Sequence, residues 1–333
     1  MGLFMHRLKT YLPGISLASV LAVIAWKLGR ALPIVGAPVF GILLGMTVAF
    51  WRRPDGFTVG IRFSSKQLLQ YAIILLGFEM NLFRVLEVGQ QTLVLMAFTL
   101  TVTFATAYIA GRILRLDGVV TTLIGVGTAI CGGSAIAATA PVIGAADEEV
   151  AQSISTIFLF NVIAAFAFPF IGHVVGMNDH SFGVWAGTAI NDTSSVVAAG
   201  YSYSQVAGDL AVIVKLTRTL AIIPVALALA FLVRRRNDGI QGEAFKLSAV
   251  FPWFVIGFLA ASVITTFSGL PLSLTSGLGD AGKFMIVVAM AAIGLNTHVG
   301  KLIKSGGKPL LFGLVCSVVL AMTSLGAQAV LGI

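Results

Sequence analysis

Long apolar runs separated by short polar gaps recur along the whole chain. Each run approaches the length of roughly 20 residues that an α-helix needs to cross a bilayer. The gaps hold glycine, proline, asparagine and clustered charge, as turns between spanning helices do. The pattern predicts an all-α integral membrane protein, a single transmembrane domain over residues 1–333. We expect about eleven spanning helices, at residues 12–26, 33–51, 68–88, 92–111, 119–144, 150–172, 182–205, 209–233, 249–268, 283–300 and 308–331.

Composition leaves no room for a large soluble domain. Hydrophobic residues make up 58% of the chain and charged residues only 10%, whereas about a quarter of the residues in soluble domains are charged. Cys131 and Cys316 both lie in apolar runs, so they predict neither a disulfide framework nor a metal site. The net charge of +8 comes from basic residues in the gaps between runs. Membrane orientation explains this placement, and no nucleic-acid partner is expected.

The basic residues sort by side when the gaps are assigned alternately to the two faces of the membrane. With the N-terminus inside, 15 of the 21 lysines and arginines fall inside and four fall outside, among them Lys283. The acidic run Asp147–Glu149 also falls outside. This bias follows the positive-inside rule. It predicts a multi-pass membrane protein with its N-terminus inside, on the cytoplasmic face, and its C-terminus on the opposite face.

An internal likeness suggests a repeat. The stretch Leu75–Leu114 aligns without gaps on Ala292–Leu331, at an offset of 217 residues. Under the predicted topology the two copies start from opposite faces of the membrane. They would therefore form an inverted repeat, an arrangement that recurs in secondary transporters, with one copy at about 33–172 and the other at about 182–331.

A second, local likeness joins Gly127–Ser134 to Gly187–Ser194, because both begin Gly-Thr-Ala-Ile. The predicted topology runs these two segments in the same direction, so they are not inverted copies of each other. Either one segment re-enters on the side from which it came, or the likeness is shared local design. The sequence leaves both interpretations open.

Lys215 and Arg218 are two charges inside an apolar run, and their i,i+3 spacing puts them on one helix face. Counted from Asp209 at about 1.5 Å per residue, they lie roughly 9 and 13 Å deep. Charge at depth costs roughly 2.5–3.5 kcal/mol per residue, so we expect these two to bind an anion. Arginine offers a planar fork for sulfonate, sulfate or carboxylate oxygens. The alternative is that both residues neutralise Asp192 and Glu79 in a buried ion-pair network.

Five consecutive polar residues, from Asn191 to Ser195, interrupt another apolar run. A broken helix that lines a cavity tolerates such a run, whereas a continuous lipid-facing helix does not. We therefore assign substrate binding to Asn191, Thr193, Ser194 and Ser195, and coupling of a proton or Na⁺ to Asp192. Hydrogen bonding between helices is the alternative.

The adjacent glycines of the other Gly-Thr-Ala-Ile segment favour an unwound stretch in the middle of a predicted span. Its N–H groups would face an anion as a helix N-terminus does. We assign Cys131, Gly132, Gly133 and Ser134 to the same substrate site. Close helix packing by small residues is the alternative.

Four further polar residues are related by the 217-residue repeat. Glu79 and Asn81 align with Asn296 and His298, and both pairs fall near the middle of predicted spans. Glu79 and His298 are candidates for carrying a coupling proton. A polar contact between crossing helices is the alternative for all four. Asn161, a lone amide in its run, is expected to hold helices together rather than to bind solute.

Four segments taken together, Gly127–Ala137, Gly187–Ala198, Lys215–Arg218 and Leu76–Leu82, resemble the bacterial YeiH-like family, to which sulfate export is ascribed. The resemblance covers essentially the whole chain. It implies an inner-membrane protein with inverted five-helix repeats and crossed broken helices, similar to bile-acid/sodium symporters and sodium/proton antiporters. Those folds place their broken helices at equivalent repeat positions, which the two Gly-Thr-Ala-Ile segments do not occupy. The span at 283–300 is therefore a second candidate for a broken helix.

These features predict a secondary-active transporter that exports small anions, such as sulfate, sulfite or organosulfonates, by alternating access. The sequence has no H-E-x-x-H, G-x-S-x-G or Walker motif, so we expect neither catalysis nor a cofactor beyond Na⁺ or H⁺ coupling. The alternative is a Na⁺- or H⁺-coupled carrier or antiporter for another solute, with Lys215 and Arg218 structural. An intramembrane enzyme that uses Cys131 and His298 is the weakest interpretation. The expected partners are the anion and the bilayer, with a homodimer left open.

Overall fold

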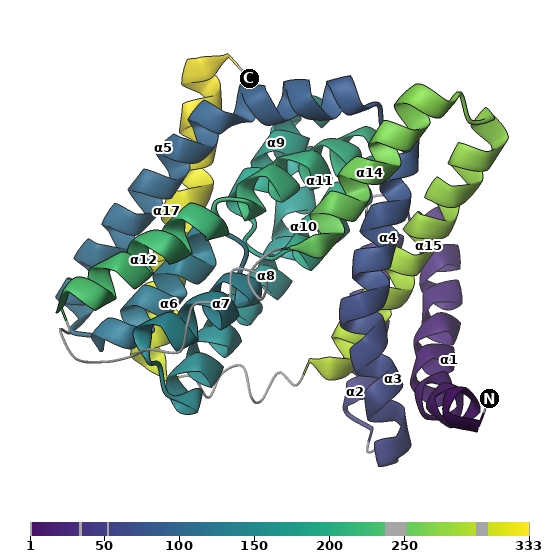
Figure 1. The fold of residues 1–333 in the computed structure, drawn as a ribbon, viewed down its shortest axis with the longest axis horizontal. Coiled ribbons are helices and arrows are strands. Elements are labelled where there is room, and N and C mark those ends of the chain that lie inside the picture. Colours follow the sequence, from purple (N-terminus) through teal and green to yellow (C-terminus); the bar gives the residue numbers. More distant parts are fainter. Residues whose placement is uncertain (1, 33–34, 52, 237–251, 298–305, 333) are drawn as a thin grey trace.

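A computed structural model describes residues 2–32, 35–51, 53–236, 252–297 and 306–332 (Figure 1). The described chain is helical, with short 3₁₀ and π segments along a rod at residues 55–79. The helices are α1 Gly2–Ala31, α2 Ala37–Ala49, η1 Asp55–Phe57, α3 Thr58–Phe63, η2 Ser64–Leu68, α4 Leu69–Leu76, η3 Gly77–Glu79, α5 Leu82–Leu114, α6 Gly118–Ala129, α7 Gly133–Ile143, α8 Asp147–Val175, α9 Asp179–Ala189, α10 Thr193–Tyr203, α11 Gln205–Thr219, α12 Ile222–Arg236, α14 Trp253–Ser268, α15 Leu272–Asn296 and α17 Gly307–Leu331.

Six helical stretches among the described residues are long and apolar enough to cross a membrane. They are Thr10–Ala31, Leu82–Leu114, Asp147–Val175, Gln205–Leu229, Leu272–Asn296 and Gly307–Leu331. Shorter apolar helices, α2, α6, α7 and α14, accompany them. The prediction of an all-α, multi-pass membrane protein is confirmed at this level. The two chain ends lie at opposite ends of the molecule (Figure 1).

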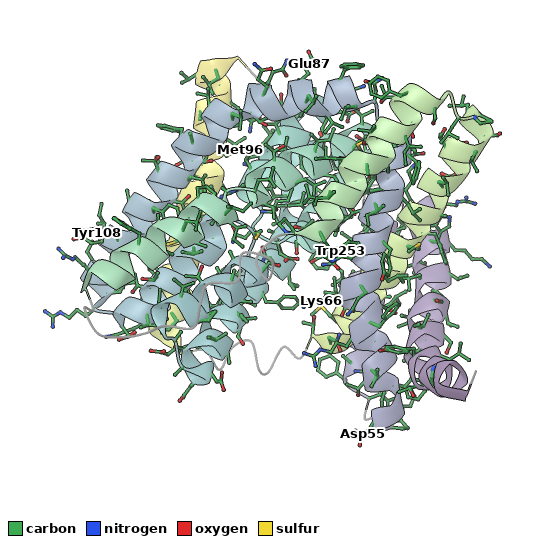
Figure 2. All side chains as sticks on the ribbon, in the orientation of Figure 1. Asp55, Lys66, Glu87, Met96, Tyr108 and Trp253 are labelled. Carbon is green, nitrogen blue, oxygen red and sulfur yellow. The ribbon has the colours of Figure 1, made fainter. Side chains whose placement is uncertain are left out.

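The long helix α5 carries apolar side chains on its buried face and also on its exposed face. Leu95 and Met96 are buried, whereas Val94 and Phe98 are more than half exposed. The polar side chains of Glu87 and Tyr108 project outward near the two ends of the helix (Figure 2). A helix that is apolar on both faces suits a lipid environment.

The helices form two bundles (Figure 1). The first bundle contains α1 to α4, α14 and α15, and the second contains α5 to α12 and α17. In the first bundle α2 and α15 approach closely, because Gly45 and Gly294 face each other's backbones and leave no room for a Cβ atom. The bundles meet where α10 packs on α2 and α15. One apolar cluster runs through this junction, so the bundles share a core.

The predicted span at 119–144 is wrong, because this stretch is a helical hairpin that does not cross the bundle. The chain reverses at Gly132, whose φ of 67° and ψ of −130° suit glycine alone. Helix α7 then packs back along α6, and a Cβ built on Gly127 would lie 3.0 Å from the side chain of Ile136. At the open end, Ile143 joins the same apolar cluster as Val119 and the end of α5. We call α6 and α7 the first hairpin.

The predicted span at 182–205 is wrong for the same reason. Helices α9 and α10 form a second hairpin that reverses at residues 190–192. At its open end the ring of Tyr203 stacks on Phe182, with centroids 3.8 Å apart, and on His173, at 4.3 Å. The Tyr203 hydroxyl also donates to the carbonyl of Met177. The end of α10 therefore lies beside the start of α9.

Helix α8 connects the open end of the first hairpin to the open end of the second. Because α8 is one continuous helix of 29 residues, the hairpins enter the second bundle from opposite ends. Both Gly-Thr-Ala-Ile segments therefore re-enter on the side from which they came. Helices α6 and α9 run in opposite directions, so the prediction that the two segments run in the same direction is wrong. The acidic run Asp147–Glu149 begins α8 beside the end of α5, so its assignment to the face opposite Arg112 is wrong.

Other predicted boundaries also need correction. The rod that includes α4 ends at Glu79 and α5 begins at Leu82, so no single span covers 68–88. Helix α15 is continuous from Leu272 to Asn296, so the predicted span at 283–300 has no break as far as Asn296, and its last residues, 298–300, lie outside the described residues. Helix α15 also places Lys283 within a helix instead of in an outside loop. The alignment at offset 217 and the repeat boundaries 33–172 and 182–331 stay predictions, as does the orientation of the chain ends.

Candidate functional site at the hairpin tips

The two hairpin tips meet at Lys215, near the C-terminal end of α11. Its ammonium donates to the carbonyl of Ile130, at 2.9 Å, and to the carbonyl of Ile190, also at 2.9 Å. Ile130 and Ile190 directly follow the last residues of α6 and α9. The end of a helix leaves such carbonyls without a partner inside the helix. Lys215 has no solvent exposure, so these two bonds replace the water that its charge would otherwise bind.

Arg218 lies one turn further along α11 and faces the first tip. Its Nε donates to the carbonyl of Ala129, at 2.7 Å, and its Nη2 to the carbonyl of Thr128, at 3.3 Å. The residue is fully buried. Its Nη1 has no hydrogen-bond partner among the residues that the structure describes. A buried donor without a partner is costly. A bound ligand with an acceptor atom at Nη1 would remove this cost.

Asn161, from the middle of α8, joins the tips from the other side. Its Oδ1 accepts from the backbone N–H of Asn191, at 3.2 Å, and from that of Asp192, at 3.0 Å. A Cβ built on Gly132 would lie 3.3 Å from the Cβ of Asp192 and 3.5 Å from the Nδ2 of Asn161. The two tips therefore touch each other as well as sharing Lys215. Asn161 holds helices together, as expected, but does so at the candidate site.

The other predicted binding residues lie at or next to the tips. Asp192 precedes α10 and caps it, because its Oδ2 accepts from the backbone N–H of Ser194, at 2.9 Å, and also from the Ser194 hydroxyl. Asn191 is buried, and its Oδ1 has no partner within the described chain. Cys131 is buried at the first tip. The remaining predicted residues belong to the first turns of α7 and α10: Gly133, Ser134, Thr193 and Ser195.

Within the described chain, Lys215 and Arg218 do not form the ion pairs with Asp192 and Glu79 that the alternative interpretation gave them. Both cations bind main-chain carbonyls instead. Glu79 pairs with Lys283, and its Oε2 lies 2.9 Å from the lysine Nζ. That pair lies at the end of the α4 rod, where Glu79 also packs on Gly279.

The residues singled out by the 217-residue repeat do not join the tips. Asn81 caps α5, because its Oδ1 accepts from the backbone N–H of Phe83 at 2.8 Å. Asn296 ends α15 and donates to the Ser65 hydroxyl at 3.2 Å. The prediction that these residues lie in the middle of spans is wrong for Glu79, Asn81 and Asn296, which all lie at helix ends. His298 lies outside the described residues.

Sequence reasoning missed the main partners of the cations, which are main-chain carbonyls of residues 128–130 and 190. Apolar side chains at positions 129, 130 and 190 gave no sign of this role. The available signal was the repeated Gly-Thr-Ala-Ile motif, because the same local sequence ends the first helix of both hairpins.

Comparison with known proteins identifies the family. Residues 13–313 match the family described as "Conserved hypothetical protein 698". The chain is 46% identical over 333 residues to a UPF0324 membrane protein of Streptococcus agalactiae serotype V, covering 97% of this chain and 98% of the relative. The chain belongs to this family. The predicted resemblance to this UPF0324, or YeiH-like, family is thus confirmed over nearly the full chain.

Further UPF0324 relatives come from other bacteria. A membrane protein of Streptococcus pyogenes serotype M6 is 48% identical over 331 residues, and one of Fusobacterium nucleatum is 45% identical over 341 residues. They cover 97% and 96% of this chain, and the match covers 98% of each relative. Their names describe membrane proteins, which agrees with a multi-pass membrane location.

Among solved structures, the sodium proton antiporter MjNhaP1 from Methanocaldococcus jannaschii matches 98% of this chain and 99% of its own. The TM-score is 0.28 and the sequence identity is 15%. Because both values are low, the likeness carries no argument about mechanism or ion.

Proposed function

We propose that this UPF0324 protein is a secondary transporter that binds a small anion at the hairpin tips. The observation that carries the proposal is the Nη1 of Arg218, a buried donor without a partner in the described chain. An arginine fork is well matched to oxyanions, which accept from its planar N–H groups. The free Oδ1 of Asn191 on the neighbouring tip is an acceptor, so it suits a donor group of the solute or a coupling cation and not the oxygens of the anion.

The charges at the tips also favour an anion. Lys215 and Arg218 contribute two positive charges and Asp192 contributes one negative charge. Each helix C-terminus carries about −0.5 of a charge and each N-terminus about +0.5. The C-termini of α6 and α9 and the N-termini of α7 and α10 all lie at the tips, so their partial charges sum to about zero. An excess of about one positive charge remains, which one singly charged ligand would neutralise. We therefore favour an organosulfonate or hydrogen sulfite over doubly charged sulfate.

The hairpins offer a route to alternating access. One enters from each end of the second bundle, so moving either hairpin would open the tips toward one face only. Discontinuous helices around a central site are a recurrent design of secondary transporters. We assign the coupling ion, a proton or Na⁺, to Asp192 because it is the predicted carboxylate at the tips. Glu79, Asn81, Asn296 and His298 stay a second, separate prediction for ion coupling.

A second candidate is a Na⁺- or H⁺-coupled carrier of another solute in which the two cations are structural. The observation that favours it is that the hydrogen bonds of Lys215 and Arg218 go to main-chain carbonyls. This candidate requires that anion binding does not depend on Arg218. We propose no catalytic role for the chain.

Flux into proteoliposomes tests the proposal, with ³⁵S-labelled sulfite and a labelled alkylsulfonate as substrates. Arg218→Lys keeps the charge but removes the fork and its Nη1, and we expect uptake to fall at least about tenfold, the loss of one charge-assisted hydrogen bond. Arg84→Lys, at an exposed position on α5, is the matched control and should transport normally. Anion uptake that is unchanged in Arg218→Lys would favour the second candidate.

A further inference from the structure

We propose that the ammonium group of Lys215 serves as a tethered cation that holds the two hairpin tips together, in the place where a bound alkali cation would otherwise sit. The carbonyls of Ile130 and Ile190 form the cation site, and the chain supplies its own occupant. The proposal concerns how the tips are joined, so it holds whichever solute the protein carries.

The geometry of the two bonds is symmetric. Ile130 and Ile190 occupy the same position in the two Gly-Thr-Ala-Ile motifs, and each carbonyl lies 2.9 Å from the Lys215 Nζ. Each residue follows the last residue of a half-helix, where carbonyls point away from the helix without internal partners. Two equivalent helix ends therefore converge on a single positive charge.

Lys215 bonds the negative ends of two helices. Each of these C-termini carries about −0.5 of a charge, and the positive N-termini of α7 and α10 begin three residues further along each turn. Within the described chain, carboxylates form ion pairs with Lys283 and not with Lys215. Since Lys215 is fully buried, the two carbonyls take the place of water as acceptors for its ammonium. An unpaired ammonium at this depth would be strongly disfavoured.

Carbonyls at half-helix C-termini are typical ligands for Na⁺ in transporters with discontinuous helices. Here the lysine already occupies them, so the folded tips need no alkali cation at this point. Removing the ammonium would leave two buried carbonyls facing each other without a donor. A small cation supplied from solution would then be able to take its place.

Thermal unfolding of the purified full-length protein in detergent micelles tests this replacement. In Lys215→Ala the missing atoms correspond to n-propylammonium, so this ion should raise the Tm of the variant by at least about 2 °C. Tetramethylammonium has the same charge but no N–H donor, and it should have no effect at the same chloride concentration. Lys215→Met, whose side chain fills the path of the lysine stem, should be destabilised and respond to neither ion.

Two results would overturn the proposal. One is equal stabilisation of Lys215→Ala by both ammonium ions, and the other is a Lys215→Met protein with the Tm of the wild type. A variant that keeps Lys215 gives an independent test should Lys215→Ala not fold. In Asp192→Asn, which lacks the carboxylate proposed for ion coupling, the Tm should be the same in NaCl and in choline chloride of equal ionic strength, and a rise specific to Na⁺ there would contradict a tethered cation. None of these readouts needs a transported anion, so failure of the transport proposal would leave them interpretable.

Discussion

The two hairpin tips share the sequence that ends their first helix and differ in the sequence that begins their second. Both contain Gly-Thr-Ala-Ile, but the first continues Cys-Gly-Gly-Ser and the second Asn-Asp-Thr-Ser. The shared half supplies a carbonyl to Lys215 in each tip. The repeated sequence is therefore explained by a shared structural task.

The second halves of the two tips differ in sequence, and the two turns are stabilised in different ways. The first tip reverses at the positive φ of Gly132, and no side chain caps the start of α7. The second tip reverses in extended backbone that Asn161 and Asp192 hydrogen-bond. Asp192 thus already partners the start of α10, whereas no side-chain cap is present at Gly132 before α7. Under the proposed function, we therefore expect the anion to bind nearer the first tip and the coupling ion, a proton or Na⁺, to bind nearer the second.

Asn161→Ala tests the second tip and should have the largest effect. It removes the shared acceptor of two buried N–H groups, and we expect a loss of about 3 kcal/mol in unfolding free energy. Denaturant titration in micelles measures the loss. Asn161→Asp keeps the acceptor oxygen and should lose much less. Equal stability of Asn161→Ala and the wild type would mean that the second tip is held by other contacts.

Gly132→Ala tests the first tip. Alanine at φ 67° and ψ −130° is strained, and its Cβ would lie 3.3 Å from the Cβ of Asp192. We expect a loss of about 2 kcal/mol, measured by the same titration. Gly133→Ala is the matched control, because a Cβ there meets nothing within 4 Å. Similar losses in both variants would show that the turn does not depend on the conformation of Gly132.

Two substitutions of Asp192 distinguish its role as a helix cap from its proposed role in ion coupling. Asp192→Ala should cost about 1 kcal/mol through the lost cap, whereas Asp192→Asn, an equally good cap, should be nearly as stable as the wild type. If Asp192 carries the coupling proton, Asp192→Asn should still abolish pH-driven flux in proteoliposomes. Retention of pH-driven flux by Asp192→Asn would remove the second tip from the coupling mechanism.

Glu79→Gln should have the smallest effect and serves as a reference outside the tips. The Glu79 and Lys283 side chains are 20% and 18% exposed, so solvent weakens their pair, and we expect a loss of about 0.5 kcal/mol. Thermal unfolding measures it, and anion affinity at the tips should not change. A large drop in anion affinity would instead connect the first bundle to the site.

The sequence was informative where chemistry is local. Lys215, Arg218 and the two Gly-Thr-Ala-Ile segments were recognised because charge and adjacent polar residues are rare in apolar runs, and the structure brings these elements together. The hairpins were missed for a physical reason. The 26 residues from Gly118 to Ile143 are as long and apolar as one crossing, and hydropathy does not record a reversal of direction.

The partners of the cations were hidden for a different reason. Main-chain carbonyls carry no residue identity, so Ile130 and Ile190 look like any other core position. Lys283 was assigned to a loop because α15 begins in the polar stretch Leu272–Gly277, which lowers the hydropathy of its first turns. In both cases the missing information is tertiary.

Helix α8 has one property that ties the two ends of the second bundle together. Asn161, which is bonded to the second tip, lies fourteen residues from Asp147 and fourteen from Val175, so it marks the midpoint of the helix. Each arm is roughly 21 Å long at about 1.5 Å per residue, and each arm ends at the mouth of one hairpin. A tilt of α8 as a rigid body about Asn161 would carry the two mouths in opposite directions, and a bend at Pro169 would change how far the second mouth moves.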